Sequence, residues 1–103
     1  MEINLPRMTV GIMIVWMSKP KLFVKEGCPW CIDALAYFET KSLSLDIIDV
    51  RKEPSKMDVL LAVSGQSKTP TLQNGDFVVA DFDIGEFEDA MSKNPEEAKK
   101  LGL

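Results

Sequence analysis

The sequence contains no histidine, and cysteine occurs only twice among its 103 residues. The absence of histidine excludes Cys–His nucleophile pairs, histidine-ligated metals and acid–base catalysis by imidazole. Two thiols from one chain cannot supply all the ligands of a four-thiolate metal site, so we expect no metal cofactor. A metal shared between two chains, or held with external thiols, remains an alternative.

Basic residues are outnumbered: the chain has 12 Lys and Arg against 16 Asp and Glu, which gives a net charge of −4. Nucleic-acid-binding proteins cluster their basic residues, and no basic run occurs here, so we expect no nucleic-acid partner. A length of 103 residues fits one compact domain with a modest hydrophobic core. The two cysteines are therefore not needed to hold the fold together.

The most hydrophobic stretch is Met8 to Met17, and at about ten residues it is too short to span a bilayer. Only Arg7 precedes it as a basic residue, and no small-residue cleavage site follows, which argues against a secretory signal. We therefore expect a cytoplasmic protein with no membrane partner. We expect residues 1–16 to be an N-terminal extension and residues 17–103 to form the domain. The extension is either an added strand or packed arm, or a non-native stretch before a start at Met17.

Residues 21–50 have the pattern of a strand, a helix and a second strand. Strands are expected at 21–25 and 45–50, with a helix from Pro29 to about Lys41 between them. Two strands joined by a helix within about 30 residues form a βαβ unit, so these strands should be parallel. The apolar face of the helix is expected to include Ile32, Leu35 and Phe38.

The second half of the chain predicts a helix, a hairpin and two further helices. The first helix should begin at Pro54 and stop at Gly65. Strands at 71–73 and 77–80 flank Asn74-Gly75, a strong hairpin signal. Asp83 and Glu86 have the spacing of a capping box at the start of the next helix. A last short helix should run from Asn94-Pro95 to about Gly102.

The motif Cys28-Pro29-Trp30-Cys31 lies where the first strand gives way to the first helix, which is typical of a thiol–disulfide site. Cys28 occupies the helix N-cap, where free backbone N–H groups and the helix dipole favour a thiolate. Cys31 lies one turn further along the same face, close enough to form a disulfide with Cys28. Lys25 is expected to add a second cationic influence. A purely structural disulfide would close a very short loop and contribute little stability.

Lys25-Glu26-Gly27-Cys28-Pro29-Trp30-Cys31 resembles the active-site segment of glutaredoxins, and the resemblance extends over about residues 21–91. It implies an α/β, thioredoxin-like fold: a four-stranded mixed sheet of order 2-1-3-4 flanked by helices, with the elements in the order β-α-β-α-β-β-α and a short C-terminal helix. It also implies that Cys28 is the nucleophile and Cys31 the resolving thiol. Trp30 replaces the commoner Tyr and keeps a flat apolar wall.

Ser64-Gly65-Gln66-Ser67-Lys68-Thr69-Pro70 is similar to the glutaredoxin loop that ends in a cis-proline facing the active site. The resemblance implies that Pro70 is cis and that Thr69 offers its backbone N–H and C=O groups to an extended substrate peptide. A plain helix-to-strand turn is the alternative. Lys68 would meet a ligand carboxylate or remain an ordinary solvated lysine.

Val79-Ala80-Asp81-Phe82-Asp83 lies where glutaredoxins have two glycines followed by a polar or acidic residue. By this resemblance, Phe82 donates its backbone N–H to glutathione and Asp83 meets the glutathione amino group. The alternative is that Asp83 only caps its helix, and both roles are compatible. Ala80 and Asp81 replace the glycines, so a negative side chain intrudes where glutathione should approach closely.

The sequence therefore predicts a glutathione-dependent thiol–disulfide oxidoreductase that acts on disulfide-bonded or glutathionylated proteins through Cys28 and Cys31. Asp81 motivates one alternative, a redoxin reduced by a thioredoxin-reductase-type flavoprotein. Another is a module in which Cys28 and glutathione hold an iron–sulfur cluster, and a disulfide-introducing protein outside the cytoplasm is a third. The residues expected to bind glutathione or substrate are Lys25, Trp30, Gln66, Thr69, Pro70, Phe82 and Asp83.

Overall fold

The structure, a computed structural model, describes residues 19–103. The expected N-terminal extension, residues 1–16, and the possible start at Met17 lie outside the described residues. In chain order the elements are β1 (Lys21–Val24), α2 (Pro29–Thr40), β2 (Asp46–Asp49), α3 (Ser55–Ser64), β3 (Thr71–Asn74), β4 (Phe77–Ala80), α4 (Ile84–Lys93) and α5 (Pro95–Leu101). This order is the predicted one, and each boundary lies close to its predicted position.

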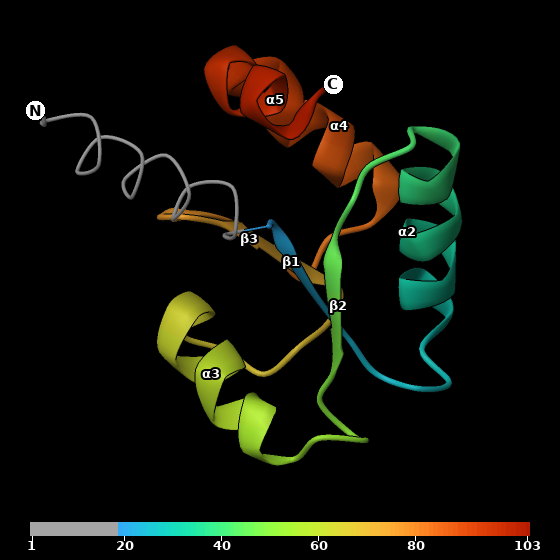
Figure 1. Cartoon of the computed structure of the whole chain (residues 1–103), viewed down its shortest axis with the longest axis vertical. Coiled ribbons are helices and arrows are strands. Elements are labelled where there is room, and N and C mark those ends of the chain that lie inside the picture. Colours follow the sequence, from blue (N-terminus) through green and yellow to red (C-terminus); the bar gives the residue numbers. More distant parts are fainter. Residues whose placement is uncertain (1–18) are drawn as a thin grey trace, which may run out of the picture.

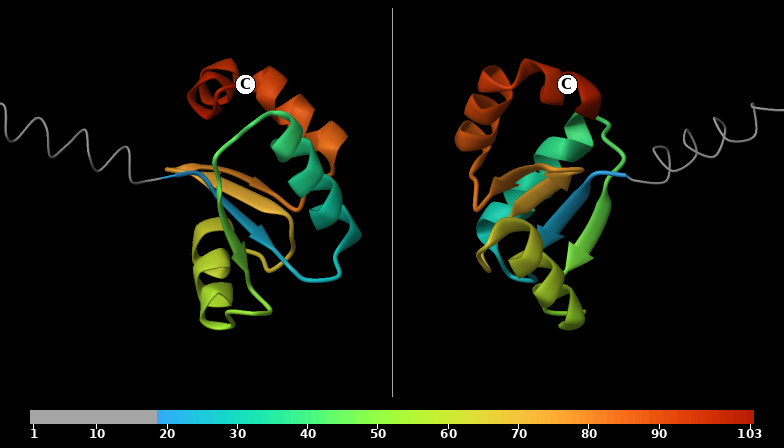
Figure 2. Two further views of the ribbon diagram at one scale, coloured as in Figure 1. Left: turned by 45° about the vertical axis from the view of Figure 1, so that its right-hand side comes forward. Right: turned by 90° about the vertical axis from the view of Figure 1, so that its left-hand side faces the viewer.

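The four strands form one mixed sheet of order β2-β1-β3-β4, as predicted. Strand β1 pairs with β2 in parallel and with β3 antiparallel, and β3 and β4 form the hairpin. Figures 1 and 2 show α3 on one face of the sheet and α2 and α4 on the other. Because β1 and β2 are parallel, their carboxyl ends lie at the same edge of the sheet. The first turn of α2 begins at this edge.

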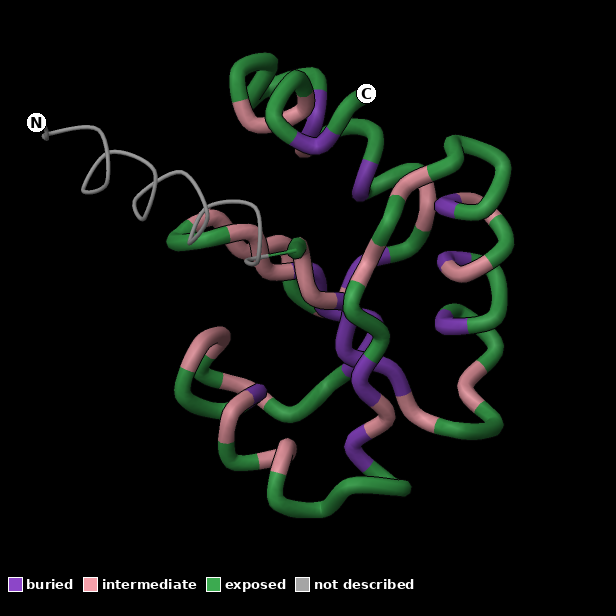
Figure 3. Tube along the Cα trace, viewed as in Figure 1, coloured by how far each residue is buried: buried purple, intermediate pink, exposed green. Residues whose placement is uncertain are grey.

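Strand β1 is buried on both faces, as a central strand should be. Side chains alternate along a strand, so Leu22 and Val24 pack into the core under α2 and α4, while Phe23 packs against Leu60 on the α3 side. Figure 3 shows the buried stretches of chain gathered along this strand and on the side of α2 that faces the sheet. The end of β1 is thereby fixed in place, and the active-site motif follows it directly.

Helix α2 buries most of the predicted apolar face, including Phe38, but not all of it. Its buried residues are Cys31, Ala34 and Phe38, with Leu35 packed against them. The prediction that Ile32 belongs to this face was wrong, because Ile32 is 60% exposed. Residues at i, i+3 and i+7 share a helix face, so a buried Cys31 turns its neighbour Ile32 towards solvent.

Helix α4 begins with the predicted capping box. The Asp83 carboxylate accepts a hydrogen bond from the Glu86 N–H at 2.7 Å, and the Glu86 carboxylate accepts one from the Asp83 N–H at 2.9 Å. Just before this cap, Phe82 enters the core and packs against Phe87 and Phe38. Among the helices of residues 19–103, none has the length and apolar character needed to cross a membrane.

Candidate active site

The Cys28 thiol lies at the N-terminus of α2, next to its first turn. After β1 the chain turns through Gly27, whose φ of 83° is in the left-handed region that favours glycine. The Cys28 N–H then donates to the Lys25 carbonyl at 3.2 Å. Cys28 is the N-cap of α2, and its sulfur accepts a hydrogen bond from the Cys31 N–H at 3.3 Å. The sulfur therefore accepts a hydrogen bond from a first-turn N–H group that has no partner within the helix.

The loop between α3 and β3 faces this thiol. The Thr69–Pro70 peptide bond is cis, as the resemblance implied. Thr69 is nearly buried, and its hydroxyl lies 3.8 Å from the Cys28 sulfur. The Thr69 carbonyl oxygen also lies 3.8 Å from that sulfur and accepts a hydrogen bond from the thiol. A segment 41 residues away in sequence thus provides both a donor and an acceptor to Cys28.

The two cysteines have opposite shifts of pKa. For Cys28, burial is the largest influence and raises the pKa, but hydrogen bonds from Cys31, Thr69 and Trp30 together lower it below the ordinary value of 9.0. For Cys31, burial and then the neighbouring Cys28 thiol raise the pKa to about 11. The Lys25 charge, which we had expected to lower the pKa of Cys28, is not among the strongest influences on it. Of the two thiols, Cys28 is therefore the more easily ionised, and Cys31 holds its proton more strongly.

A groove of about 550 Å³ opens beside the Cys28 sulfur. Its lining residues are Lys25, Gly27, Cys28, Pro29, Trp30, Arg51, Lys68, Thr69 and Asp81. Three of these side chains are cationic and only one is acidic. Trp30 is 54% exposed and lines this groove.

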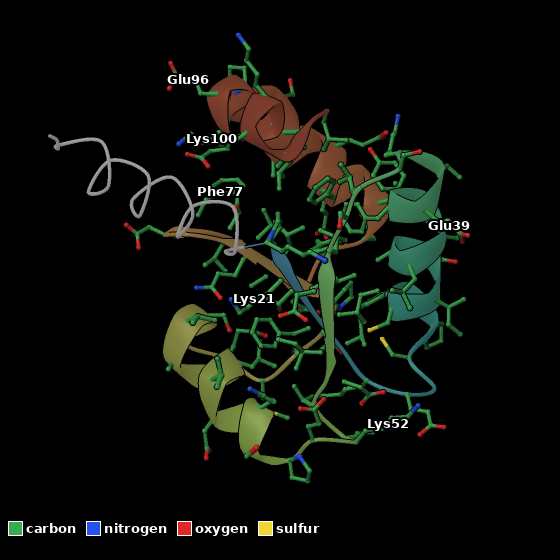
Figure 4. The ribbon with its side chains drawn as sticks, in the orientation of Figure 1. Lys21, Glu39, Lys52, Phe77, Glu96 and Lys100 are labelled. Atoms are coloured by element: carbon green, nitrogen blue, oxygen red, sulfur yellow. The ribbon has the colours of Figure 1, made fainter. Side chains whose placement is uncertain are left out.

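Arg51 was not predicted from the sequence. Its guanidinium donates to the Glu26 carbonyl at 2.7 Å and so ties the loop after β2 to the loop before α2. The loop after β2 is itself held by the Asp49 carboxylate, which accepts hydrogen bonds from the N–H groups of Arg51 and Lys52. Lys52 marks the same loop in Figure 4. The parallel pairing of β1 and β2 was the available signal, because the carboxyl ends of parallel strands meet at one edge.

The acidic residue of the groove is Asp81, which the sequence analysis aligned with a glycine of glutaredoxins. It has a φ of 54° although it is not glycine. Its N–H donates to the Thr71 hydroxyl at 3.3 Å, which fixes the backbone at this strained position. The carboxylate that we expected to intrude is therefore present at the site, held by the end of β4 and the start of β3.

Two of the expected ligand contacts have other partners in the structure. The Phe82 N–H, which we had expected to face glutathione, donates to the Pro70 carbonyl at 3.3 Å, and the Phe82 side chain lies in the core. The Asp83 carboxylate is used by the capping box of α4, and Asp83 does not line the groove. Asp81, two residues earlier, is the acidic residue that lines the groove.

Gln66 acts inside its own loop and does not line the groove. Its amide oxygen accepts from the Lys68 N–H at 2.7 Å, and its amide nitrogen donates to the Thr71 hydroxyl at 3.2 Å. These bonds fix the turn that presents Lys68 and Thr69 to Cys28. Within residues 19–103, no three His, Cys, Asp or Glu side chains gather as a metal site would require.

Comparisons with known proteins agree with this geometry. The family model described as Glutaredoxin matches residues 21–78, more than half of the chain. A search of curated protein sequences gives no match. Three similar solved structures are a glutaredoxin from Archaeoglobus fulgidus, a thioredoxin-like protein and a buckwheat glutaredoxin in complex with glutathione.

These three structures share the fold at low sequence identity. The Archaeoglobus fulgidus protein is 17% identical over 71% of this chain and 85% of its own, with a TM-score of 0.63. The thioredoxin-like protein is 24% identical over 74% and 97%, with a TM-score of 0.64. The buckwheat protein is 15% identical over 91% and 86%, also with a TM-score of 0.64.

Proposed function

Because this chain belongs to the glutaredoxin family of thiol–disulfide oxidoreductases, we propose that it reduces glutathione mixed disulfides and that glutathione is its reductant. The observation that carries the proposal is the charge pattern of the groove beside Cys28. Lys25, Arg51 and Lys68 provide three cations, and Asp81 provides the single carboxylate. The groove is thus built for a ligand with more negative than positive groups.

Glutathione has this distribution of charge. It is a tripeptide with a carboxylate at each end, one free ammonium group and a central thiol. With its sulfur on Cys28, its carboxylates would pair with the cationic side chains and its ammonium group with Asp81. Thr69 would bind its backbone and Trp30 would cover its apolar part. In this proposal Asp81 takes the role that the sequence analysis gave to Asp83.

The proposed reaction begins with attack by the Cys28 thiolate on the glutathione sulfur of a protein–glutathione disulfide. A Cys28–glutathione disulfide forms, and the protein sulfur leaves as a thiolate and takes up a proton. A second glutathione, as thiolate, then attacks this mixed disulfide, which yields oxidised glutathione and regenerates Cys28. For protein disulfides, Cys31 would instead attack the mixed disulfide and form the Cys28–Cys31 bond. The low pKa of Cys28 makes it a good leaving group when the mixed disulfide is resolved.

The partners that follow from this proposal are glutathione and disulfide-bonded or glutathionylated proteins. We also propose that the protein acts in the cytoplasm, where glutathione is kept reduced.

A second candidate keeps the chemistry and changes the reductant. Asp81 places a negative charge and a Cβ where the family has glycine, and the Phe82 N–H already bonds Pro70. In this second candidate both features hinder the binding of glutathione, and a thioredoxin-reductase-type flavoprotein is the reductant instead.

Turnover of a glutathione mixed disulfide, with glutathione, glutathione reductase and NADPH, tests the proposal. Robust activity that disappears in Cys28→Ser would support it. Asp81→Asn should raise the KM for the mixed disulfide several-fold, whereas the matched variant Asp76→Asn, in the β3–β4 turn, should leave it unchanged. A folded, reduced protein with no activity would reject glutathione, and turnover by thioredoxin reductase would then support the second candidate.

A further inference from the structure

Four segments of the chain meet at the edge of the sheet where Cys28 lies. The sheet order is β2-β1-β3-β4; β1, β2 and β4 run in one direction and β3 runs in the opposite one. The carboxyl ends of β1, β2 and β4 and the amino end of β3 therefore share this edge. Figure 2 shows β1 and β2 running side by side towards it. The pairing register agrees, because Asp49 lies opposite Val24, and Ala80 lies opposite Thr71.

Two opposite charges lie at the two ends of this edge. Arg51 follows β2, the first strand of the order, and Asp81 follows β4, the last one. Neighbouring strands lie about 4.8 Å apart, so the ends of β2 and β4 are about 14 Å apart. Cys28 follows β1, and its thiol bonds the Thr69 carbonyl in front of β3, so the reactive sulfur lies between the two charges. All four residues line the same groove.

The protein holds both charges in position. The Arg51 guanidinium donates to the Glu26 carbonyl at 2.7 Å, and this bond uses one of the five N–H donors of the guanidinium. The Asp81 backbone has a φ of 54° and is fixed by the hydrogen bond from its N–H to the Thr71 hydroxyl. A substrate that pairs with these two side chains therefore meets charges whose separation is already set.

The other two cations of the groove belong to the central strands of the sheet. Lys25 follows β1, and Lys68 comes just before Thr69 in the segment that leads into β3. Because these cations lie near the middle of the edge, they attract an anionic substrate in either orientation. The orientation is decided by the outer charges, Arg51 and Asp81, which have opposite signs.

We infer that Arg51 and Asp81 select protein disulfides by the charges on either side of the reacting cysteine, with an acidic residue on the Arg51 side and a basic residue on the Asp81 side. In an extended segment, the residues two before and two after the cysteine point the same way as the cysteine. At about 3.3 Å per residue they lie about 13 Å apart, which matches the separation of the strand ends. Once Cys28 is bonded to substrate, the Thr69 carbonyl loses its bond from the thiol and can accept an N–H of the segment.

The inference rests on the part of the proposed function in which Cys28 acts on protein disulfides, and glutathione has no role in it. The Cys28 thiolate attacks the cysteine sulfur of the segment and forms a bond to it. The other sulfur of the disulfide leaves with the electron pair of the broken bond and takes up a proton. Charge contacts made before this step raise the rate of attack at limiting substrate concentration.

The test compares two peptides of the same composition, Asp-Gly-Cys-Gly-Lys and Lys-Gly-Cys-Gly-Asp, with both termini blocked. The cysteine of each peptide forms a disulfide with 2-nitro-5-thiobenzoate, which is released as a coloured thiolate when Cys28 attacks the peptide sulfur. The protein carries Cys31→Ser, so the reaction stops at the disulfide between Cys28 and the peptide, and the mass of this product identifies the bound part. Because the two peptides have the same net charge, long-range attraction does not distinguish them.

We expect one peptide to react about fivefold faster than the other at limiting concentration, as for two exposed ion pairs that form with one peptide only. The faster peptide shows in which direction the segment runs. Arg51→Gln and Asp81→Asn should each lower the ratio to about twofold, and together they should lower it to about one. Lys52→Gln, in the same loop as Arg51 but outside the groove, should leave the ratio unchanged. In about 1 M salt the ratio should also approach one.

A ratio below about twofold before these substitutions, or a ratio that persists in the double variant, would overturn the inference. An uncharged peptide, Ala-Gly-Cys-Gly-Ala, separates the charge of Arg51 from its support of the loop. If Arg51→Gln slows all three peptides equally, Arg51 has only a structural role and the inference is wrong. No release of thiolate from any peptide would instead reject the action of Cys28 on protein disulfides, so the two failures are distinguishable.

Discussion

The rate at which Cys31 resolves a mixed disulfide should rise steeply with pH, because its pKa is raised from 9.0 to about 11. At about pH 7, a two-unit rise leaves a thiol roughly 100-fold less ionised. The thiolate that does form is about eightfold more nucleophilic, given a Brønsted slope of about 0.45. Resolution by Cys31 should therefore be about tenfold slower than resolution by an unperturbed thiol in the same position.

The cause of the shift persists in the mixed disulfide. Burial, the largest contribution, does not depend on the state of Cys28. The smaller contribution of the Cys28 thiol disappears once that sulfur is bonded to substrate. The pKa of Cys31 should thus fall somewhat during the reaction and stay above its ordinary value.

The perturbation that tests this reasoning is Cys31→Ser, together with a pH series of the resolving step. The original protein, in reduced form, is mixed with a 2-nitro-5-thiobenzoate disulfide, which releases one coloured thiol when Cys28 attacks and a second when Cys31 resolves the mixed disulfide. The rate of the second release should rise close to tenfold per pH unit from about pH 7 to about pH 9. With a monothiol reductant in excess, Cys31→Ser should keep most of its turnover, because an external thiol bypasses the slow step. Cys28→Ser should lose it entirely.

Two results would refute the reasoning. One is a resolving rate that levels off below about pH 8, which would show that the pKa of Cys31 is not raised. The other is a large loss of monothiol-driven turnover in Cys31→Ser, which would show that Cys31 resolves faster than the external thiol.

Three further predictions concern stability and can be checked by thermal or denaturant unfolding. Leu60→Ala should cost about 2–5 kcal/mol because Leu60 is fully buried, whereas Leu61→Ala, beside it and 45% exposed, should cost much less. Asp83→Ala should cost about 1 kcal/mol through loss of the α4 cap and should leave the KM for a glutathione mixed disulfide unchanged. Folding raises the pKa of Cys31 from 9.0 to about 11, so the protonated thiol contributes fully to stability below about pH 9 and this contribution is lost as the pH rises towards about 11. Between these two pH values Cys31→Ser should therefore lose less stability than the original protein.

Much of the fold could be predicted because its signals are local. Asn74-Gly75 permits one tight hairpin, and Asp83 with Glu86 specifies one helix start. The buried face of α2 was harder, because two overlapping apolar faces pass through this short helix. Apolar spacing favoured Ile32, whereas packing under the sheet favours Cys31 and Ala34. The tertiary contacts decide between such faces, and they are not encoded in the helix alone.

From the residues alone the active site was predictable where they are adjacent in sequence, whereas the loop of Thr69 and Pro70 was expected only from the resemblance to glutaredoxins. Cys28 and Cys31 belong to one motif at one helix start, so their placement followed from helix geometry. Arg51 reaches the same site from another loop, and its position depends on the pairing of β1 with β2. The partner of the Phe82 N–H was likewise hidden, because it is a carbonyl of the distant Pro70.

The charge of the groove is opposite in sign to that of the whole chain. This difference bears on which charges of a substrate decide whether it binds. The chain has a net charge of −4, yet the groove beside Cys28 has three cationic side chains and one acidic one. Exposed charges are screened beyond about 8 Å at physiological ionic strength, so the distant acidic residues have little influence on a group bound there. An anionic disulfide should therefore meet little repulsion from the distant acidic residues and a net attraction from the groove. Selection by charge should depend on the groups next to the scissile disulfide and not on the net charge of the protein that contains it.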